Sequence, residues 1–160
     1  MAVLSPETLM SVLGIDEKDL DCAGQKLHLD KVFRFLSSGY IGREKKLLPQ
    51  YEEVPPVDDV YRLGPGAYKV RYREIVRVPP NAIALAIPRS TLLRSGVMLF
   101  TAVWDPGYFG RGEGLLVVYN PHGVEIEVGA QIAQLVYISM DRATSKLYRG
   151  TYLGENIGST

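Results

Sequence analysis

Cysteine is almost absent from this chain of 160 residues, and neither sign of charge is in excess. The single Cys22 excludes an internal disulfide framework and favours a reducing compartment, in which a buried and inert thiol is expected. Lys plus Arg number 18 and Asp plus Glu also number 18, so the formal net charge is zero. Without a single-sign field we expect no nucleic-acid partner, and any anionic ligand has to be met by local cations.

Long hydrophobic runs are absent as well. No run reaches the ~18 apolar residues that a membrane-spanning helix needs, and the first residues, MAVLSPETLM, carry no basic segment typical of a leader. We therefore predict a soluble, cytoplasmic protein without a membrane partner. The length suits a single domain over residues 1–160 that buries a continuous core.

Helical periodicity is confined to the N-terminus. Residues 1–14 predict one short helix, in which Ser5 is the cap, Pro6 fits the first turn and Gly14 ends it. Beyond it, short runs rich in Val, Ile, Tyr and Leu alternate with Gly and Pro. These runs predict strands over 27–35, 68–78, 83–87, 97–104, 115–119, 124–128 and 132–138. Many short strands at this spacing are typical of an all-β sandwich or jelly roll.

Two segments fall outside this pattern. Residues 43–59, REKKLLPQYEEVPPVDD, are charged and hold three prolines, which predicts a surface insertion and not core. Residues 149–160, RGTYLGENIGST, are polar and glycine-rich. This composition suits either a mobile tail or a lid, and both interpretations stay open.

Four clusters of polar residues and glycines stand out among the strands. They are Pro88-Arg89-Ser90-Thr91-Leu92, Trp104-Asp105-Pro106-Gly107-Tyr108 with Gly110, Gln131-Ile132-Ala133-Gln134-Leu135, and Arg149-Gly150 with Gly154, Gly158 and Ser159. Taken singly, each is ordinary for a turn or a strand edge. Together, in their order and spacing, they resemble the trimeric dUTP pyrophosphatase and dCTP deaminase superfamily, closest to the archaeal-type deoxyuridine triphosphate nucleotidohydrolases. The resemblance covers about residues 22–138, and RSTLLRSG followed by TAVWDPGY carries most of it.

The resemblance implies a distorted jelly roll that forms a homotrimer, with three active sites built from motifs of neighbouring subunits. It also implies hydrolysis of dUTP to dUMP and pyrophosphate with Mg²⁺. Cleavage between the α and β phosphates needs donors on the phosphates, an oriented water and usually a divalent metal. The metal ligands are not indicated by the motifs.

The family's pattern assigns roles to several residues. Asp105 deprotonates the attacking water, Tyr108 lies against the deoxyribose, and Gln134 reaches the phosphates. Arg89 offers a bidentate fork for phosphate, and Ser90, if it begins a short helix, adds a hydroxyl and a nearby N–H. Ordinary core packing is the alternative for Tyr108. The further candidates for substrate binding are Thr91, Arg94, Lys26 and Arg149.

The choice between uracil and cytosine is not written in side chains. In this family a hairpin, here within residues 102–118, reads the base through its backbone. Deaminases of the superfamily also use a glutamate in the strand after the Asp-Pro-Gly motif to move protons. Counting along the chain puts that position at Leu115 or Val117, both apolar, and we interpret the nearby Glu113 as a solvated loop charge.

The second hypothesis is a dCTP deaminase, either monofunctional or bifunctional. Arg94 and Thr101-Ala102 match the deaminase pattern. The tail, which reads Tyr152-Leu153-Gly154-Glu155-Asn156, also looks closer to the deaminases than to the glycine-rich fifth motif of the dUTP pyrophosphatases. The apolar residues at the glutamate position count against deamination.

The first motif departs from the pattern. It reads Ala-Gly-any-Asp-Leu in the family, whereas Ala23-Gly24-Gln25-Lys26-Leu27 has Lys26 in place of the aspartate. A cation there would repel magnesium, so the site is impaired, or Asp30 or His28 compensates, or Lys26 itself contacts the triphosphate. An impaired site is the basis of a third hypothesis, a homologue that binds nucleotide without turnover. His28 and His122 lack further ligands at zinc spacing, so no zinc site is expected.

Overall fold

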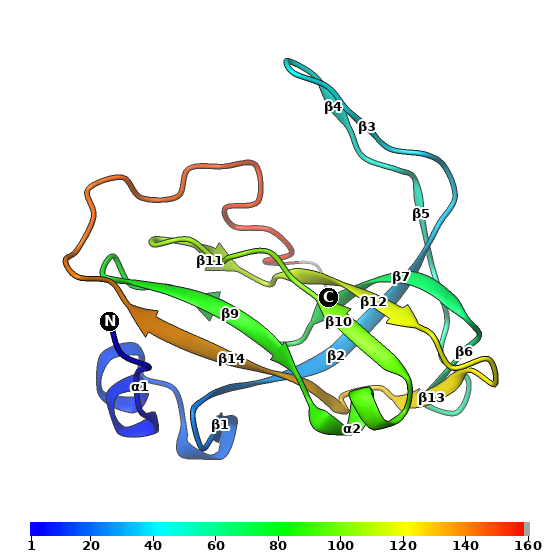
Figure 1. Cartoon of the computed structure of the whole chain (residues 1–160), viewed down its shortest axis with the longest axis horizontal. Helices are drawn as coiled ribbons and strands as arrows, with labels where there is room; N and C mark the ends of the chain where they lie inside the picture. The colour runs from blue at the N-terminus through cyan, green and yellow to red at the C-terminus, as the bar shows by residue number, and fades with distance from the viewer. Residues whose placement is uncertain (159–160) are drawn as a thin grey trace.

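Strands dominate the computed structural model, which describes residues 1–158 (Figure 1). The helical elements are α1 (Pro6–Leu13), the 3-10 turn η1 (Glu17–Asp19) and α2 (Ser90–Arg94). The strands are β1 (Leu20–Asp21), β2 (Gly24–Phe35), β3 (Tyr40–Ile41), β4 (Lys46–Leu47), β5 (Tyr51–Glu53), β6 (Val60–Leu63), β7 (Gly66–Tyr72), β8 (Val76–Arg77), β9 (Ala82–Pro88), β10 (Val97–Phe100), β11 (Phe109–Gly110), β12 (Glu113–Val118), β13 (Val124–Glu127) and β14 (Gln131–Ser139). The prediction of an all-β, jelly-roll-like fold with one short N-terminal helix is confirmed.

The long strand β2 links the two halves of the main sheet. Its first residues pair with β14, while its later residues pair with β7 and β5. The register shifts between Leu29 and Lys31, and this irregularity lets one strand turn from one layer to the other. The resulting order is β10-β12-β7-β2-β14-β9, with every pair antiparallel.

A backbone bridge brings the two ends of this order together. Ala84 of β9 and Trp104, which follows β10, exchange two N–H···O hydrogen bonds of 2.9 Å. The sheet therefore curls toward a barrel, and the segment that carries Trp104-Asp105 is fixed against the middle of β9. Strand 97–104 was predicted without a break, but β10 ends at Phe100 because the chain leaves β12 to reach β9.

The predicted cap of the N-terminal helix is confirmed. The Ser5 hydroxyl accepts a hydrogen bond from the Thr8 N–H at 3.4 Å, and Pro6 is the first helical residue. Gly14 ends the helix at φ 67°, which a glycine adopts without strain. Leu9 is fully buried and joins α1 to the core.

The core runs between the two layers of the sandwich. Its largest fully buried side chains are Leu9, Leu27, Leu29, Val32, Tyr61, Val70, Tyr72, Val76, Leu116, Ile132, Leu135 and Tyr137. Gln25 of the first motif is also buried, and its amide oxygen accepts a hydrogen bond from the Tyr137 hydroxyl at 2.9 Å. A buried polar group needs such a partner, so this bond ties β2 to β14 inside the core.

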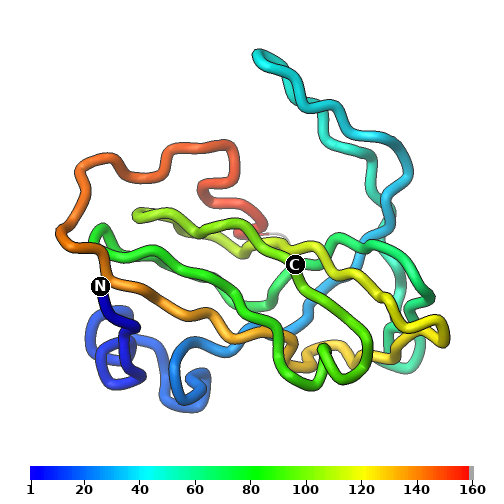
Figure 2. The backbone as a smooth tube through the Cα atoms, in the orientation of Figure 1, coloured from blue at the N-terminus to red at the C-terminus, as the bar shows by residue number. Residues whose placement is uncertain are grey.

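Residues 43–59 do not form one surface insertion. The projecting part is the hairpin β3–β4, which begins before residue 43 and extends away from the sandwich (Figure 2). β5 belongs to the main sheet through its pairing with β2, and Val54 is buried in the core. The prediction that no part of 43–59 is core is wrong, because apolar Val54 follows a strand that the charged composition concealed.

Two further expectations meet the structure in different ways. Cys22 is exposed, and the expectation of a buried thiol is wrong, because the residue lies in the turn between β1 and β2. Within residues 1–158 no helix is long and apolar enough to span a membrane. Ser159, part of the predicted tail, lies outside the described residues together with Thr160.

Candidate active site

Asp105 and Tyr108 occupy the two ends of one tight turn. The Asp105 carbonyl accepts a hydrogen bond from the Tyr108 N–H at 3.0 Å, with Pro106 second and Gly107, at φ 84°, third. Proline and a glycine of positive φ at these positions are typical of a type II turn. The turn leaves the Asp105 side chain exposed to solvent and buries the Tyr108 side chain, although the two residues are only three positions apart.

The ring of Tyr108 is enclosed by aromatic side chains. Trp104 stacks on it at 5.8 Å between centroids with an interplanar angle of 15°, and Tyr148 packs against it at 5.9 Å. The hydroxyl donates a hydrogen bond of 2.7 Å to Glu155. Burial, followed by this bond to a carboxylate, raises the pKa of Tyr108 well above its ordinary value. With 4% of its surface exposed, Tyr108 meets a ligand only after the tail moves.

Both residues border a cavity of about 360 Å³, which is large enough for a small ligand. The lining residues are Leu48, Tyr51, Ala102, Val103, Trp104, Asp105, Tyr108, Glu113, Tyr148, Tyr152 and Glu155. Aromatic rings and carboxylates make up most of the wall, a surface suited to a flat ring with hydrogen-bond donors.

The tail is packed over this cavity. The Gly154 N–H donates to the Phe109 carbonyl at 2.7 Å, and the Glu155 backbone carbonyl accepts from the Arg111 N–H at 3.0 Å. Asn156 donates to the Arg111 carbonyl at 2.9 Å. From the other side the β3–β4 hairpin reaches the tail, since the Lys46 ammonium bonds to the Thr151 hydroxyl at 3.4 Å. The cavity is thus closed by two segments far apart in sequence.

We expect the docking of the tail to depend on pH through Glu155. Burial raises the pKa of Glu155 above its ordinary value of 4.5. A carboxyl group whose pKa is higher when docked takes up a proton on docking, so docking weakens as pH rises from 4.5 through the raised pKa. We expect hydrogen exchange of residues 148–156, corrected for intrinsic rates, to show less protection at about pH 8 than at about pH 5. Glu155→Gln removes this dependence, and a wild-type tail that gains protection with pH contradicts it.

A second group of polar residues surrounds the start of α2. Arg89 is the residue before this helix, and its guanidinium forms an ion pair of 2.7 Å with Asp21. Gln131 donates to the same Asp21 oxygen at 2.5 Å. Asp21 thus orients Arg89, and a phosphate that binds Arg89 has to compete with this carboxylate.

Other candidate residues of the clusters at 88–92 and 131–135, together with Arg94, follow along α2 and β14. Ser90 begins α2, as the prediction required, and its hydroxyl accepts a hydrogen bond of 3.1 Å from Arg94. Thr91 and Arg94 are exposed. With its amide oxygen turned toward β1–β2, Gln134 accepts from the N–H groups of Ala23 and Gly24 at 3.0 and 3.1 Å.

The structure does not bring the two groups together within one chain. Trp104, next to Asp105, is bridged to Ala84 of β9. Arg89 directly follows the end of β9, five residues after Ala84. Five residues of extended chain span about 16 Å. Neither Arg89, Ser90 nor Gln134 lines the cavity that Asp105 and Tyr108 border.

The departure in the first motif has a definite local structure. The Lys26 ammonium donates to the Lys18 carbonyl at 2.7 Å. Asp30 is paired with Arg71 at 2.6 Å, and His28 is bonded to Glu74 at 2.5 Å. The two proposed substitutes for the missing aspartate therefore already have partners.

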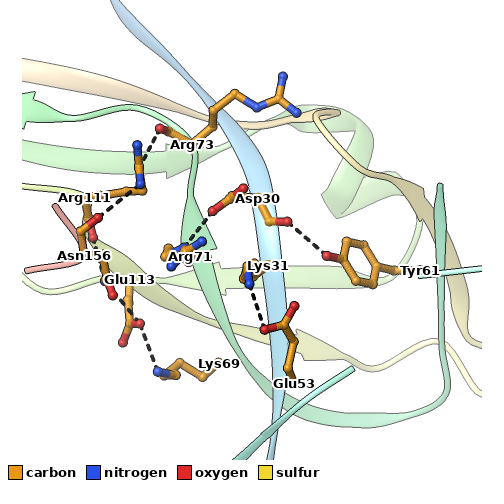
Figure 3. Close-up of polar contacts among 10 residues, drawn as sticks. All are labelled: Asp30, Lys31, Glu53, Tyr61, Lys69, Arg71, Arg73, Arg111, Glu113 and Asn156. Atoms are coloured by element: carbon orange, nitrogen blue, oxygen red, sulfur yellow. Dashed lines mark hydrogen bonds and ion pairs between the residues drawn. The ribbon is translucent and has the colours of Figure 1, made fainter. Parts of the chain in front are cut away.

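Glu113 is not a solvated loop charge, and that interpretation is wrong. It is the first residue of β12, and its side chain is 26% exposed. Figure 3 shows it between Lys69 and Asn156. Its carboxylate pairs with Lys69 at 2.9 Å and accepts a hydrogen bond from Asn156 at 3.4 Å. The glycines on both sides suggested a loop, but Gly112 just before β12 and Gly114 within it allow close packing against aromatic rings.

Several residues of the site had no signal in the sequence. Asp21 lies 68 positions before Arg89, and only the pairing of β2 with β14 and of β14 with β9 brings them together. Tyr51, Tyr148 and Glu155 come from the hairpin side and the tail, where composition suggested surface. The predicted candidate Arg149 is exposed, and it does not line the cavity.

Metal ligands do not gather in one place. Among residues 1–158, no group of three or more His, Cys, Asp or Glu side chains is arranged to hold a metal ion. Asp105, Glu113 and Glu155 share the cavity wall without forming such a group. The side chains of one chain therefore do not fit a metal held entirely by protein.

Known proteins resemble this chain over most of its length. Residues 7–140 match the family described as dCTP deaminase-like. A protein of Aeropyrum pernix named "Probable deoxyuridine 5'-triphosphate nucleotidohydrolase" is 42% identical over 135 residues, 84% of this chain and 85% of that protein. The "Deoxyuridine 5'-triphosphate nucleotidohydrolase" of Methanocaldococcus jannaschii is 37% identical over 144 residues, 88% of this chain and 90% of that protein.

A solved structure supports the fold. The 2'-deoxycytidine 5'-triphosphate deaminase from Agrobacterium tumefaciens superposes with a TM-score of 0.70 at 18% identity. The superposition covers 89% of this chain and 50% of that one, so the present chain spans half of that structure. At this identity the likeness concerns the fold alone.

Proposed function

The chain belongs to the dCTP deaminase-like family, and from this membership and the geometry of its cavity we propose that it hydrolyses dUTP to dUMP and pyrophosphate. The relatives from Aeropyrum pernix and Methanocaldococcus jannaschii are named as deoxyuridine triphosphate nucleotidohydrolases. The observation that carries the proposal is that Asp105 and Tyr108, at the ends of one tight turn, border a single cavity of about 360 Å³.

The proposed chemistry uses Asp105 as a general base. Its exposed carboxylate takes a proton from a water that attacks the α phosphorus of dUTP. The bond to the bridging oxygen breaks, and pyrophosphate leaves with the electron pair. Tyr108 lies against the deoxyribose once Tyr148 and Glu155 have moved from its ring and hydroxyl.

The phosphates are proposed to bind the second group of residues. Arg89 exchanges Asp21 for phosphate oxygens, while Ser90 and Gln134 add hydrogen bonds, with Thr91, Arg94, Lys26 and Arg149 as further contacts. Within one chain this group lies about 16 Å along β9 from the bridge at Trp104. A homotrimer, in which a neighbouring subunit supplies the phosphate-binding group, resolves this separation.

Magnesium would be held mainly by the phosphates of the nucleotide and only in part by the protein. Mg²⁺ commonly keeps several waters and binds substrate phosphates with only one or two carboxylates. Asp105 and Glu155, which line the cavity without a third metal ligand beside them in residues 1–158, would match this use better than a protein cage. When bound, the ion neutralises phosphate charge, and the protein's part is to hold Asp105 and the water in line.

Pyrophosphate release from dUTP, dCTP, dTTP and UTP in the presence of magnesium tests the proposal. We expect release from dUTP alone and no ammonia from dCTP, since apolar Leu115 stands where deaminases carry their glutamate. Ammonia from dCTP would establish the deaminase alternative instead. If no nucleotide is cleaved, Lys26→Asp is the next variant, because gained turnover would identify a homologue that binds nucleotide without cutting it.

A further inference from the structure

The backbone around Glu113 is built to hold one side chain in place. A Cβ at Gly112 would lie 2.8 Å from the Trp104 ring, and a Cβ at Gly114 would overlap the Tyr72 hydroxyl. Both glycines are therefore required by packing, and Glu113 is the single side chain in the Gly-Glu-Gly triplet. Its backbone is fixed by the rings on either side.

Its carboxylate is held through one oxygen only. Oε1 accepts from the Lys69 ammonium at 2.9 Å and from the Asn156 amide at 3.4 Å, as Figure 3 illustrates. Lys69 is itself confined, with its ammonium 4.3 Å from the centre of the Phe33 ring and 4.1 Å from that of Tyr51. Oε2 accepts no hydrogen bond from residues 1–158, which leaves an oriented acceptor.

Glu113 stands at the boundary of two neighbouring cavities. One is the cavity of about 360 Å³ that Asp105 and Tyr108 border, and the other has a volume of about 380 Å³. Glu113, Tyr51 and Ala102 line both. A ligand beside Asp105 that fills the first cavity therefore meets Glu113.

The charge of Glu113 is paired with Lys69 but also faces like charges across the cavity. The negative charge of Glu113 adds to burial in raising the pKa of Glu155, and it also raises the pKa of Tyr108. Glu113, Glu155 and Asp105 line one cavity, so like charges are brought together. Like charges gathered on one cavity wall are typical of a ligand-binding site.

We infer that Glu113 is a base-recognition residue, so that a side chain adds to the backbone contacts with the base that the resemblance implies. Its free Oε2 accepts a hydrogen bond from N3–H of uracil while Lys69 holds the carboxylate in place. The inference rests on the proposed function, because uracil is taken from there. A carboxylate can only accept, and N3–H is the only donor on that edge of uracil. Cytosine presents an unprotonated N3 at the same place, which a carboxylate repels.

Binding of the product dUMP tests the inference without turnover. Calorimetry compares dUMP, N3-methyl-dUMP and dCMP on the wild type, Glu113→Leu and Glu113→Gln. We expect wild type to bind N3-methyl-dUMP about 100-fold more weakly than dUMP, because the buried acceptor then has no donor. Glu113→Leu weakens dUMP binding about 10- to 100-fold and removes the difference between the two ligands. Glu113→Gln keeps an acceptor in its amide oxygen, so it is expected to retain part of the difference in affinity between dUMP and N3-methyl-dUMP.

Two control variants separate recognition from structure. Asn156→Ala removes the other contact of Oε1 and is expected to change affinity for all three ligands alike, leaving their ratio as in wild type. Glu127→Gln replaces an exposed glutamate of β13 and is expected to change nothing. If Glu113→Leu fails to fold, the ratio of dUMP to N3-methyl-dUMP on wild type and Glu113→Gln still decides the question.

Defined results overturn the inference. Equal affinity of the wild type for dUMP and N3-methyl-dUMP would overturn it. A Glu113→Leu variant that keeps the wild-type ratio of these two affinities would overturn it as well. Ammonia release from dCTP that Glu113→Gln abolishes would make the residue a proton carrier instead. Wild type that discriminates at N3 but cleaves no dUTP would end the proposed function and leave the assignment of Glu113 intact.

Discussion

Asp105→Asn is expected to lower kcat for dUTP by about 10²- to 10⁴-fold, the range for loss of a general base. An amide keeps the size of the carboxylate but cannot take the proton from the attacking water. The turn does not depend on the side chain, because its 3.0 Å hydrogen bond uses the Asp105 carbonyl. Among residues 1–158 no hydrogen bond or ion pair to the Asp105 carboxylate is formed, so folding is expected to be unchanged.

Single-turnover pyrophosphate release measures this effect, with dUMP affinity and thermal unfolding measured on the same preparation. Asp141→Asn, at an exposed position, is the matched control for removing one negative charge. A parallel loss of dUMP affinity would make Asp105 a binding residue and not a base. A loss of turnover of only about threefold would exclude Asp105 as the general base, because removal of a general base is expected to cost about 10²- to 10⁴-fold.

Much of the fold could be predicted from the sequence because its signals are local. The Ser5-Pro6 start, the Gly14 stop and the alternation of apolar runs with turn residues each act within a few positions. The break after β7 was missed, because it depends on a distant partner. There the Glu74 carboxylate accepts from the His28 N–H at 2.8 Å, and the strand predicted over 68–78 divides into β7 and β8.

The candidate site could be predicted in its parts but not in its assembly. The resemblance located Asp105, Tyr108 and Arg89, and the structure puts the first two at one cavity. It could not indicate that Arg89 is paired with Asp21, since that contact follows from strand register across the sheet. Glu113 was misread for a related reason. Glycines on both sides of a residue usually indicate a loop, but here they are required by close packing against the rings of Trp104 and Tyr72.

Gly24→Ala is expected to lower the free energy of unfolding by about 3 kcal/mol, toward the upper end for overpacking in a core. Gly24 begins β2 where it runs beside β14. A Cβ there would overlap the carbonyl oxygen of Leu135 and lie 2.8 Å from its carbonyl carbon. A backbone carbonyl in the middle of a sheet cannot turn aside as a flexible side chain can, so the two strands have to separate.

Urea unfolding of Gly24→Ala and Gly64→Ala at equal protein concentration makes the comparison. A Cβ at Gly64 meets nothing within 4 Å, so the same substitution there is expected to be neutral or to stabilise by about 0.5 kcal/mol through the unfolded chain. Equal effects at the two positions would mean that the β2–β14 contact tolerates a methyl group. Loss at Gly24 alone would explain the glycine of the first motif by close strand packing, which holds Asp21 opposite Arg89 whatever residue stands at position 26.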